Sequence, residues 1–236
     1  MIKFEHPEVW GWEHAIRGMR NPMNSWERSD SKFDCISSRS EDCPGDCGEW
    51  CTGYEYVLGQ NDYDLMARLI KGGQPHRKFL RQIFVSVDIT APLYWWKEFD
   101  TYKVGTTANS CSTMHKIQAK EFTLDDFSCE HLDAPSKAVL GKVIEELNNN
   151  RNWFNRYSEL VEDGEFEGVD KKQFWWNMIQ LLPSSYNQKR TVTMTYENLL
   201  NMLEYRRGHK LDEWRQFCEW IFTLPNSHIL REGIRE

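Results

Sequence analysis

Residues 81–111, RQIFVSVDITAPLYWWKEFDTYKVGTTANSC, contain the pattern that decides the fold. Apolar side chains alternate with polar ones from Ile83 to Ile89, broken only by Phe84, which predicts a half-buried strand over residues 81–89. Ala91-Pro92 then opens a helix, because proline is tolerated in a first helical turn. The small, hydroxylated residues 105–113 follow this helix. They predict a loop whose backbone can approach a ligand closely.

The rest of the chain continues this mixture of helices and strands. Apolar residues at helical spacing predict helices, and β-branched runs predict strands. The expected helices are residues 8–20, 63–71, 136–162, 170–182, 196–207 and 211–224, and the expected strands are residues 120–124 and 189–195. No internal repeat or low-complexity linker interrupts the 236 residues. We therefore expect a single mixed α+β domain over residues 1–236.

The charge balance limits the class of ligand. With 29 basic and 36 acidic residues, the chain has a formal net charge of −7. This argues against a general nucleic-acid or membrane-surface binder, whose affinity rests on clustered positive charge. A small anionic ligand stays possible, because one pocket needs only a few cations. No apolar run reaches the roughly 18 residues of a membrane span, and no signal-peptide core occurs, so we expect a cytoplasmic protein.

Four of the seven cysteines gather in a hydrophilic stretch at about residues 26–60. Cys43, Cys47 and Cys51 form a C-x3-C-x3-C pattern, and Cys35 lies eight residues upstream. Four thiolates at this spacing can hold zinc tetrahedrally or an iron–sulfur cluster. The alternative is a set of free thiols, although a hydrophilic loop offers little core in which to bury them.

Two separated segments resemble the flavin-dependent thymidylate synthases. In residues 65–116, the order is that of the family: a helix, a histidine, a strand, Ala-Pro opening a helix, and the place of the signature Arg-His-Arg, seven residues, Ser. Here His76 falls on the family's histidine and Cys111 on the signature serine. Residues 181–206 resemble the family's Leu-Pro, strand and helix with Asn-x-x-x-x-Arg, which matches Asn201 and Arg206. The cysteine-rich stretch resembles an insertion into this pattern.

The resemblance implies the α+β fold of that family, an antiparallel-rich sheet flanked by helices, in a homotetramer with active sites between subunits. It implies pyrimidine nucleotide biosynthesis: a methyltransferase that alkylates C5 of a deoxyuridine nucleotide. FAD would be the carrier, methylenetetrahydrofolate the donor and a reduced nicotinamide the reductant. The implied positions are His76, Thr101, Tyr102, Lys103 and Asn201 at the cofactor, Asn109, Ser110, Ser112 and Arg206 at the substrate, and Arg206 and Cys111 as catalytic residues.

The charged part of the signature differs from the family. Thr101-Tyr102-Lys103 stands in place of Arg-His-Arg, Asn109 in place of a glutamate, and Thr113 and Ile179 in place of arginines. Threonine and isoleucine cannot supply the bidentate fork by which arginine holds phosphate. Lys103 keeps one positive charge. Other candidate cations are Lys116, Lys189, Arg190 and Arg20.

The sequence leaves alternatives open at two residues and for the whole protein. Cys111 is either a thiolate nucleophile toward the pyrimidine ring or a serine-sized residue packed at a turn. Arg206 is either a pocket residue that reads the base, which the family match favours, or a surface arginine near a helix end. The protein is accordingly either a synthase-like flavoenzyme or a non-catalytic or substrate-switched nucleotide-binding relative.

Overall fold

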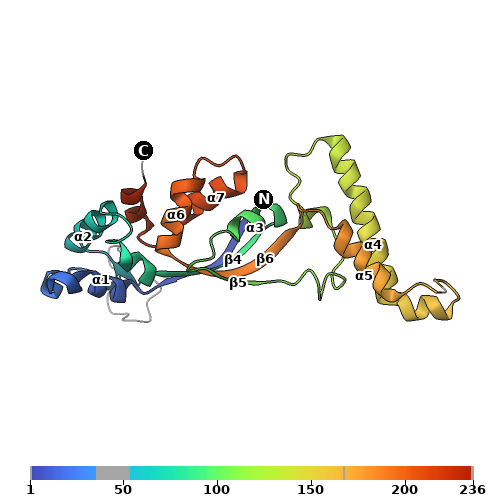
Figure 1. Cartoon of the computed structure of the whole chain (residues 1–236), viewed down its shortest axis with the longest axis horizontal. Helices are drawn as coiled ribbons and strands as arrows, with labels where there is room; N and C mark the ends of the chain where they lie inside the picture. Colours follow the sequence, from blue (N-terminus) through green and yellow to red (C-terminus); the bar gives the residue numbers. More distant parts are fainter. Residues whose placement is uncertain (1, 36–53, 167, 235–236) are drawn as a thin grey trace. The chain divides into compact units, whose positions relative to one another are not determined.

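The computed structural model describes residues 2–35, 54–166 and 168–234 (Figure 1). The strands are β1 (Lys3–Trp10), β2 (Lys32–Cys35), β3 (Tyr54–Val57), β4 (Phe84–Pro92), β5 (Thr107–Ser110) and β6 (Asn187–Thr195). The α-helices are α1 (Trp12–Arg20), α2 (Gln60–Lys71), α3 (Leu93–Phe99), α4 (Ala134–Glu162), α5 (Lys171–Leu181), α6 (Tyr196–Arg206) and α7 (Asp212–Ile221). The 3-10 helices are η1 (Asn21–Met23), η2 (Trp26–Arg28), η5 (Lys78–Gln82), η6 (Leu124–Asp126) and η7 (Ser227–Gly233).

The described strands form two sheets. The larger one has four strands in the order β1-β4-β6-β5, and the smaller one is the antiparallel pair β2-β3. Helices and antiparallel sheet occur together, so the expected α+β class is confirmed. No helix of the described residues is both long and apolar enough to cross a membrane.

The described residues group into two compact units. Unit 1 comprises the described residues within the ranges 1–5, 88–101 and 108–191, and unit 2 comprises those within the ranges 6–87, 102–107 and 192–236. The expectation of one domain over residues 1–236 stays a prediction. The two units are described separately below.

Unit 1 is built on the long helix α4 and its neighbour α5, which lie side by side (Figure 1). Asp133 caps the start of α4 by accepting a hydrogen bond from the backbone N–H of Ser136. Trp95 and Trp96 in α3 are buried, and such large aromatic side chains contribute much of the apolar area of a core. An apolar cluster that includes residues of α4 and α5 comprises Ile117, Phe122, Phe127, Leu140, Leu147 and Met178.

Unit 2 contains the helices α6 and α7, which pack against each other (Figure 1). Its other helical contacts join α2 to η7 and α6 to η5. Trp214 of α7 is fully buried and contributes a large share of apolar area to this core. The other fully buried residues include Met66, Leu80, Tyr196, Leu199, Leu200, Phe217 and Ile221.

The strand expected at residues 81–89 exists but begins later. Ile83, Val85, Val87 and Ile89 are each at most 1% exposed, so the predicted alternation of buried side chains is confirmed. β4 itself starts at Phe84 and continues to Pro92, because residues 78–82 close into η5. The helix α3 therefore begins after Ala91-Pro92 rather than at it.

The helix expected at residues 8–20 is correct only from Trp12 onward. Residues 3–10 form β1, and Gly11 separates strand from helix with a left-handed φ of 94°. A Cβ at Gly11 would lie 2.1 Å from the backbone oxygen of Gln82, so only glycine fits this junction. Apolar spacing alone does not reveal such a turn.

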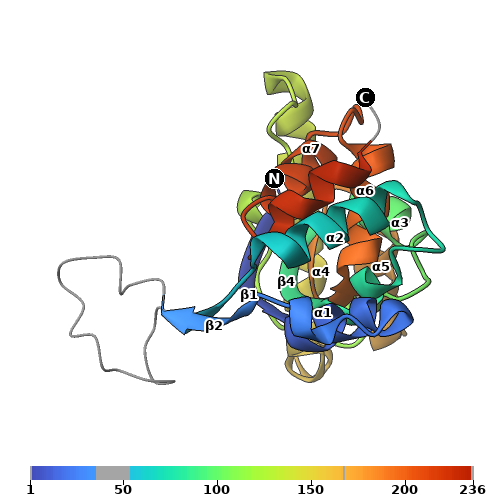
Figure 2. The same ribbon diagram turned by 90° about the vertical axis from the view of Figure 1, so that its left-hand side faces the viewer.

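Two further expectations about strands were wrong. Residues 120–124 contain no strand, whereas residues 107–110, expected as loop, form the edge strand β5. The ends of the cysteine-rich stretch pair as β2 and β3, with Lys32 opposite Val57 and Cys35 opposite Tyr54. The strand β2 is labelled in Figure 2. Short, exposed strands have little apolar alternation, which is why the pattern missed them.

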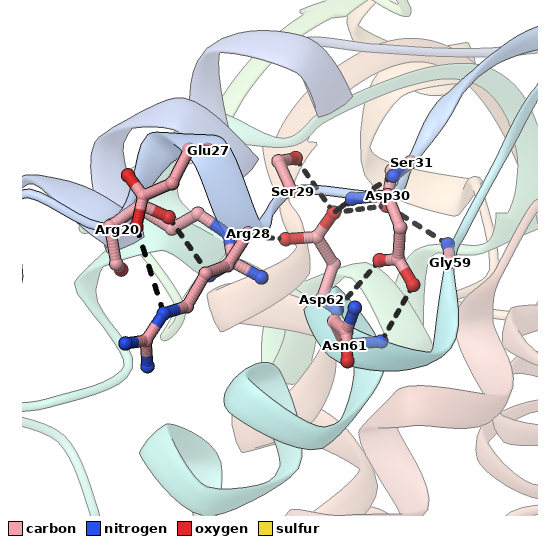
Figure 3. A network of polar contacts seen from close by, with 10 residues as sticks. Arg20, Glu27, Arg28, Ser29, Asp30, Ser31, Gly59, Asn61 and Asp62 are labelled. Atoms are coloured by element: carbon pink, nitrogen blue, oxygen red, sulfur yellow. Dashed lines mark hydrogen bonds and ion pairs between the residues drawn. The ribbon is translucent and has the colours of Figure 1, made fainter.

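A buried carboxylate fixes the chain beside this hairpin (Figure 3). Asp62 of α2 is fully buried and accepts a hydrogen bond from Nε of Arg20 at 2.6 Å. It also accepts bonds from the hydroxyls of Ser29 and Ser31 and from the backbone N–H groups of Asp30 and Ser31. Since a buried charge is costly without such partners, this network holds residues 29–31 against α2.

Candidate functional site

The segment Tyr102–Thr107 of unit 2 is anchored to the start of α6. Asn198 donates from Nδ2 to the backbone oxygen of Val104 at 2.7 Å. Its Oδ1 accepts from the backbone N–H of Thr195 at 3.0 Å and so completes a capping box. Asn198 therefore both caps the start of α6 and fixes residues 102–107, which we call the signature segment. Sequence reasoning missed it, although the T-x-x-N spacing at residues 195–198 was a usable signal.

Arg206 lies at the other end of α6, where it meets Tyr102 and Trp214. Its Nε donates to the phenolic oxygen of Tyr102 at 2.9 Å. Its Cζ lies 4.7 Å from the ring centroid of Trp214 and 5.5 Å from that of Tyr102. The guanidinium is thus held by a charge-assisted hydrogen bond and by two aromatic faces. Tyr102, which stands in the place of the signature histidine, and Arg206, which is expected to read the base, therefore meet within unit 2.

Asn201, expected at the cofactor, is bonded to a residue that the sequence did not single out. Arg77 donates from Nη2 to Oδ1 of Asn201 at 3.0 Å. Its Nε lies 3.1 Å from a carboxylate oxygen of Glu197, and both charged side chains are largely buried. Arg77 follows His76, which the resemblance marked, but a single arginine after a loop histidine gave no separate signal. His76 itself is exposed and lies against Gly72.

A cleft of about 390 Å³ opens beside Arg77 and Asn201. It contains two cations and two carboxylates, so its charge is balanced rather than positive. Its polar lining residues are Lys71, Gln74, Arg77, Asn201, Glu204 and Glu232. Lys71 and Glu232 pair across part of it, with Nζ and Oε2 2.7 Å apart. The cleft can receive a polar ligand, but it does not concentrate positive charge for a phosphate.

The other two residues in the place of Arg-His-Arg, Thr101 and Lys103, are exposed. Thr101, in unit 1, is exposed and donates its hydroxyl to the backbone oxygen of Glu98 at 2.7 Å. Lys103, in unit 2, is exposed. The ammonium group of Lys103 is therefore accessible to an anionic ligand, in keeping with the single charge that the sequence retains here.

In unit 1, three of the residues expected at the substrate lie in β5 or directly after it. Asn109 and Ser110 lie in this strand, and all four of its residues are exposed. The backbone N–H of Cys111 donates to the oxygen of Lys189 at 2.9 Å, and its oxygen accepts from Nε2 of Gln188 at 2.8 Å. The main chain of Cys111 is therefore fixed, while its thiol is exposed.

Ser112, also expected at the substrate, is engaged in a local turn. Its Oγ lies 2.9 Å from Nδ1 of His115 and accepts the backbone N–H groups of Met114 and His115. Such bonds are those of a serine that stabilises a turn. Within the part of the chain that the structure describes, no hydrogen bond links the thiol of Cys111 to a base.

Three of the four alternative phosphate cations are engaged by carboxylates. Arg20 is bonded to buried Asp62. Lys189 lies 3.1 Å from a carboxylate oxygen of Glu5 and 3.2 Å from one of Asp88, and these bonds raise the pKa of its ammonium group. These contacts are structural ion pairs.

Arg190, the third, has its guanidinium over the ring of Trp96, with Cζ 4.2 Å from the ring centroid. Its Nη1 also lies 2.7 Å from Oδ1 of Asp100. Lys116, the fourth candidate, is exposed. The sequence identifies Arg20, Lys189 and Arg190 as cations, but it does not show that carboxylates already balance their charges in the fold.

The proposed metal ligands cannot be placed. Cys43, Cys47 and Cys51 lie outside the described residues, and so does the side chain of Cys35. Among the residues that the structure does describe, no cluster of three or more His, Cys, Asp or Glu side chains is arranged to hold a metal ion. The zinc or iron–sulfur hypothesis stays a prediction.

The chain has the fold of the flavin-dependent thymidylate synthases. A structure of ThyX from Helicobacter pylori complexed with FAD and dUMP matches it with a TM-score of 0.60 and 15% identity, over 99% of each chain. A second structure of that enzyme with FAD and dUMP gives the same two values over 100% of this chain and 99% of that one. The UMP/dUMP methylase PolB from Streptomyces cacaoi, bound with 5-Br dUMP, matches with a TM-score of 0.53 and 12% identity, over 99% and 96%.

No family model matches the sequence, and no curated protein matches it either. Identities of 12–15% show a common fold and do not by themselves show a common reaction. The function must therefore be argued from the residues of this chain.

Proposed function

We propose that the protein binds a deoxyuridine nucleotide together with FAD and acts at C5 of the pyrimidine. The hydrogen bond between Arg206 and Tyr102 carries this proposal. Arg206 stands at the position that reads the base in the resembled family, and Tyr102 stands within the family's signature. The shared fold supports it, since both ThyX structures hold FAD and dUMP. A cytoplasmic homotetramer with sites between subunits is part of the same proposal.

Arg206 would contact the base. Its guanidinium carries a positive charge. A fixed positive charge beside a pyrimidine favours the electron-rich form of the ring, in which C5 is nucleophilic. The aromatic faces of Tyr102 and Trp214 exclude water from one side of that charge, which strengthens its effect on the ligand. Arg206 would therefore both select and polarise the base.

The residues available for FAD fit it in part. His76, Thr101 and Lys103 are exposed, so they are accessible, and Lys103 supplies a positive charge for a phosphate. Asn201 already accepts a hydrogen bond from Arg77, so part of its amide is engaged within the protein. FAD would supply the redox chemistry, with a folate as donor and a reduced nicotinamide as reductant. The chain would hold the flavin with fewer charged contacts than Arg-His-Arg provides.

A second candidate is a relative that binds a different nucleotide or has lost catalysis. The ion pairs of Arg20, Lys189 and Arg190 favour it, because these cations do not replace the missing phosphate ligands. A changed substrate within the same fold is represented by PolB, which is described as acting on UMP as well as dUMP. The two candidate functions therefore differ in how the protein binds the phosphate and in which sugar the nucleotide carries.

The first experiment is a visible absorption spectrum of the purified protein before and after FAD is added. Two resolved flavin bands that survive gel filtration are expected. Calorimetry with dUMP, UMP and dCMP then identifies the nucleotide, with dUMP expected to bind most tightly. Tighter binding of UMP would favour the substrate-switched candidate. A colourless protein that retains no added FAD would refute the flavoenzyme, and a broad brown shoulder would instead point to Cys43, Cys47 and Cys51.

A further inference from the structure

We propose that Tyr102 is a positioning residue that fixes the direction in which Arg206 meets its nucleotide. The resembled family has a histidine at this position of its signature, so the arrangement is particular to this chain. The inference rests on the proposed function, since it concerns the same nucleotide. It gives Tyr102 a role in binding the nucleotide, by way of Arg206, rather than in binding the flavin.

The Arg206 side chain is held at three points. Its Nε donates to the hydroxyl oxygen of Tyr102 at 2.9 Å, and its Cζ lies over the rings of Trp214 and Tyr102 at 4.7 and 5.5 Å. The two rings meet edge to face, with centroids 5.9 Å apart. An arginine side chain otherwise has several free torsions, and holding it costs conformational entropy. Contacts already made in the fold remove that cost from ligand binding.

Both partners of Arg206 are themselves fixed. Trp214 is 0% exposed in the core of unit 2, so its ring cannot turn without opening the core. Tyr102 begins the segment that Asn198 anchors through the backbone oxygen of Val104. The hydroxyl of Thr106 bonds to the backbone oxygen of Tyr102 and closes this segment on itself. The phenol therefore has a defined place relative to α6.

The hydrogen bond to Tyr102 limits the geometry that a ligand can use. A guanidinium can grip an acceptor pair from the side, through Nε and one Nη, or from the end, through both Nη groups. Because Nε of Arg206 donates to Tyr102, the side approach would have to break that bond. The end approach keeps it. The hydrogen bond to Tyr102 therefore disfavours the side approach of a base to Arg206.

The test compares Tyr102→Phe with Tyr157→Phe. Phenylalanine at position 102 keeps the ring over Arg206 and removes only the hydroxyl acceptor. Tyr157 in unit 1 is the matched control, because its hydroxyl also makes a single hydrogen bond, to the backbone oxygen of Val169 at 2.6 Å. Calorimetry measures dUMP and FAD affinity, and thermal unfolding checks the fold. Tyr102→Phe should weaken dUMP about tenfold and leave FAD unchanged, whereas Tyr157→Phe should change neither.

A second comparison separates positioning from a direct contact. In an Arg206→Lys background, which lacks Nε, Tyr102→Phe should cause no further loss of dUMP affinity. A further tenfold loss there would overturn the inference, because Tyr102 would then act without Arg206. So would an equal loss of FAD and dUMP affinity in the single variant, which indicates a general structural defect.

The inference and the proposed function fail differently. A wild-type protein that binds no deoxyuridine nucleotide refutes the proposed function, and this assignment of Tyr102 with it. A wild-type protein that binds dUMP as tightly as its Tyr102→Phe variant refutes the assignment of Tyr102 alone. The proposed function then stands with Arg206 positioned by Trp214.

Discussion

Arg20 and Asp62 form a buried ion pair, with Nε and Oδ1 2.6 Å apart and side chains 4% and 0% exposed. The pair joins the last residue of α1 to the first turn of α2. Burial alone would raise the pKa of Asp62, but hydrogen bonds from Ser31, Ser29 and Arg20 outweigh it, so the pKa lies below its usual value. The carboxylate therefore stays charged inside the protein and stabilises the fold.

Asp62→Asn should lower the stability of the protein by about 3 kcal/mol, since it leaves Arg20 buried without a counter-charge. That corresponds to a fall of roughly 6–12 °C in melting temperature for a chain of this size. Thermal unfolding monitored by circular dichroism measures this melting temperature. The control is Asp64→Asn, two residues further along α2 and exposed, which should shift the melting temperature by less than about 2 °C. Equal shifts in both variants would contradict this role for Asp62.

The same carboxylate gives a pH dependence. The pKa of Asp62 is lower in the folded state than the usual value near 3.8, so the folded state binds the proton less well than the unfolded state. Its contribution to stability is complete above that usual value and is lost as the pH falls through the lower, folded pKa. In chemical denaturation from pH 6 to pH 3, the loss of stability should therefore be smaller in Asp62→Asn than in the wild type. Parallel curves would remove Asp62 as the cause.

The sequence predicted the helices better than the strands for a physical reason. Apolar spacing over ten or more residues identified the places of α4, α5, α6 and α7, because one face of each is buried. β5 has four exposed residues and hence no buried face that could leave a pattern. β2 and β3 are defined by pairing across a long separation in sequence, which no local pattern shows.

The sequence predicted the site residues whose positions the resemblance supplied. It did not predict the residues whose importance depends on contacts made in the fold. Arg206 and Tyr102 were both singled out, and the fold brings them together. Asn198 and Arg77 were missed, because their importance lies in what they touch, namely Val104 and Asn201. Pairing in the fold also decides which cations are engaged by carboxylates, and composition cannot show it.

Gly105→Ala should loosen the signature segment. Gly105 has a left-handed φ of 79°, and an added Cβ would lie 2.9 Å from Oδ1 of Asn198. The strain of alanine at such a φ is about 1–2 kcal/mol, and the contact displaces the amide that holds Val104. We expect a melting temperature lower by about 2–6 °C and weaker dUMP binding.

The matched control for this variant is Gly141→Ala. Gly141 lies within α4, and apart from the backbone of α4 and the two neighbouring residues, no atom of the described residues comes within 4 Å of an added Cβ. Alanine there should stabilise the helix by about 0.5–1 kcal/mol and leave nucleotide binding unchanged. A Gly105→Ala variant that behaves like this control would show that the segment does not depend on the contact with Asn198.

Arg206→Lys should weaken dUMP binding by about 10- to 100-fold, although it keeps the positive charge. Lysine lacks the planar fork and the Nε that bonds to Tyr102. Arg207→Lys is the control, since Arg207 is the next residue and is exposed. Isothermal titration with dUMP compares the two variants. An equal effect of both would indicate that only the net charge near the end of α6 matters.

Cys111→Ser separates the two roles that the sequence left for this thiol. The main chain at Cys111 is fixed by Lys189 and Gln188, and serine is the residue at this position of the resembled signature. Because the thiol is exposed and no hydrogen bond to a base within the described residues activates it, we expect the variant to keep dUMP binding and turnover within about threefold of the wild type. Cys129→Ser, at a half-buried thiol of the same unit, controls for the loss of a sulfur atom. If turnover falls by several orders of magnitude in Cys111→Ser alone while dUMP still binds, Cys111 is the nucleophile, and a base from outside the described residues must activate it.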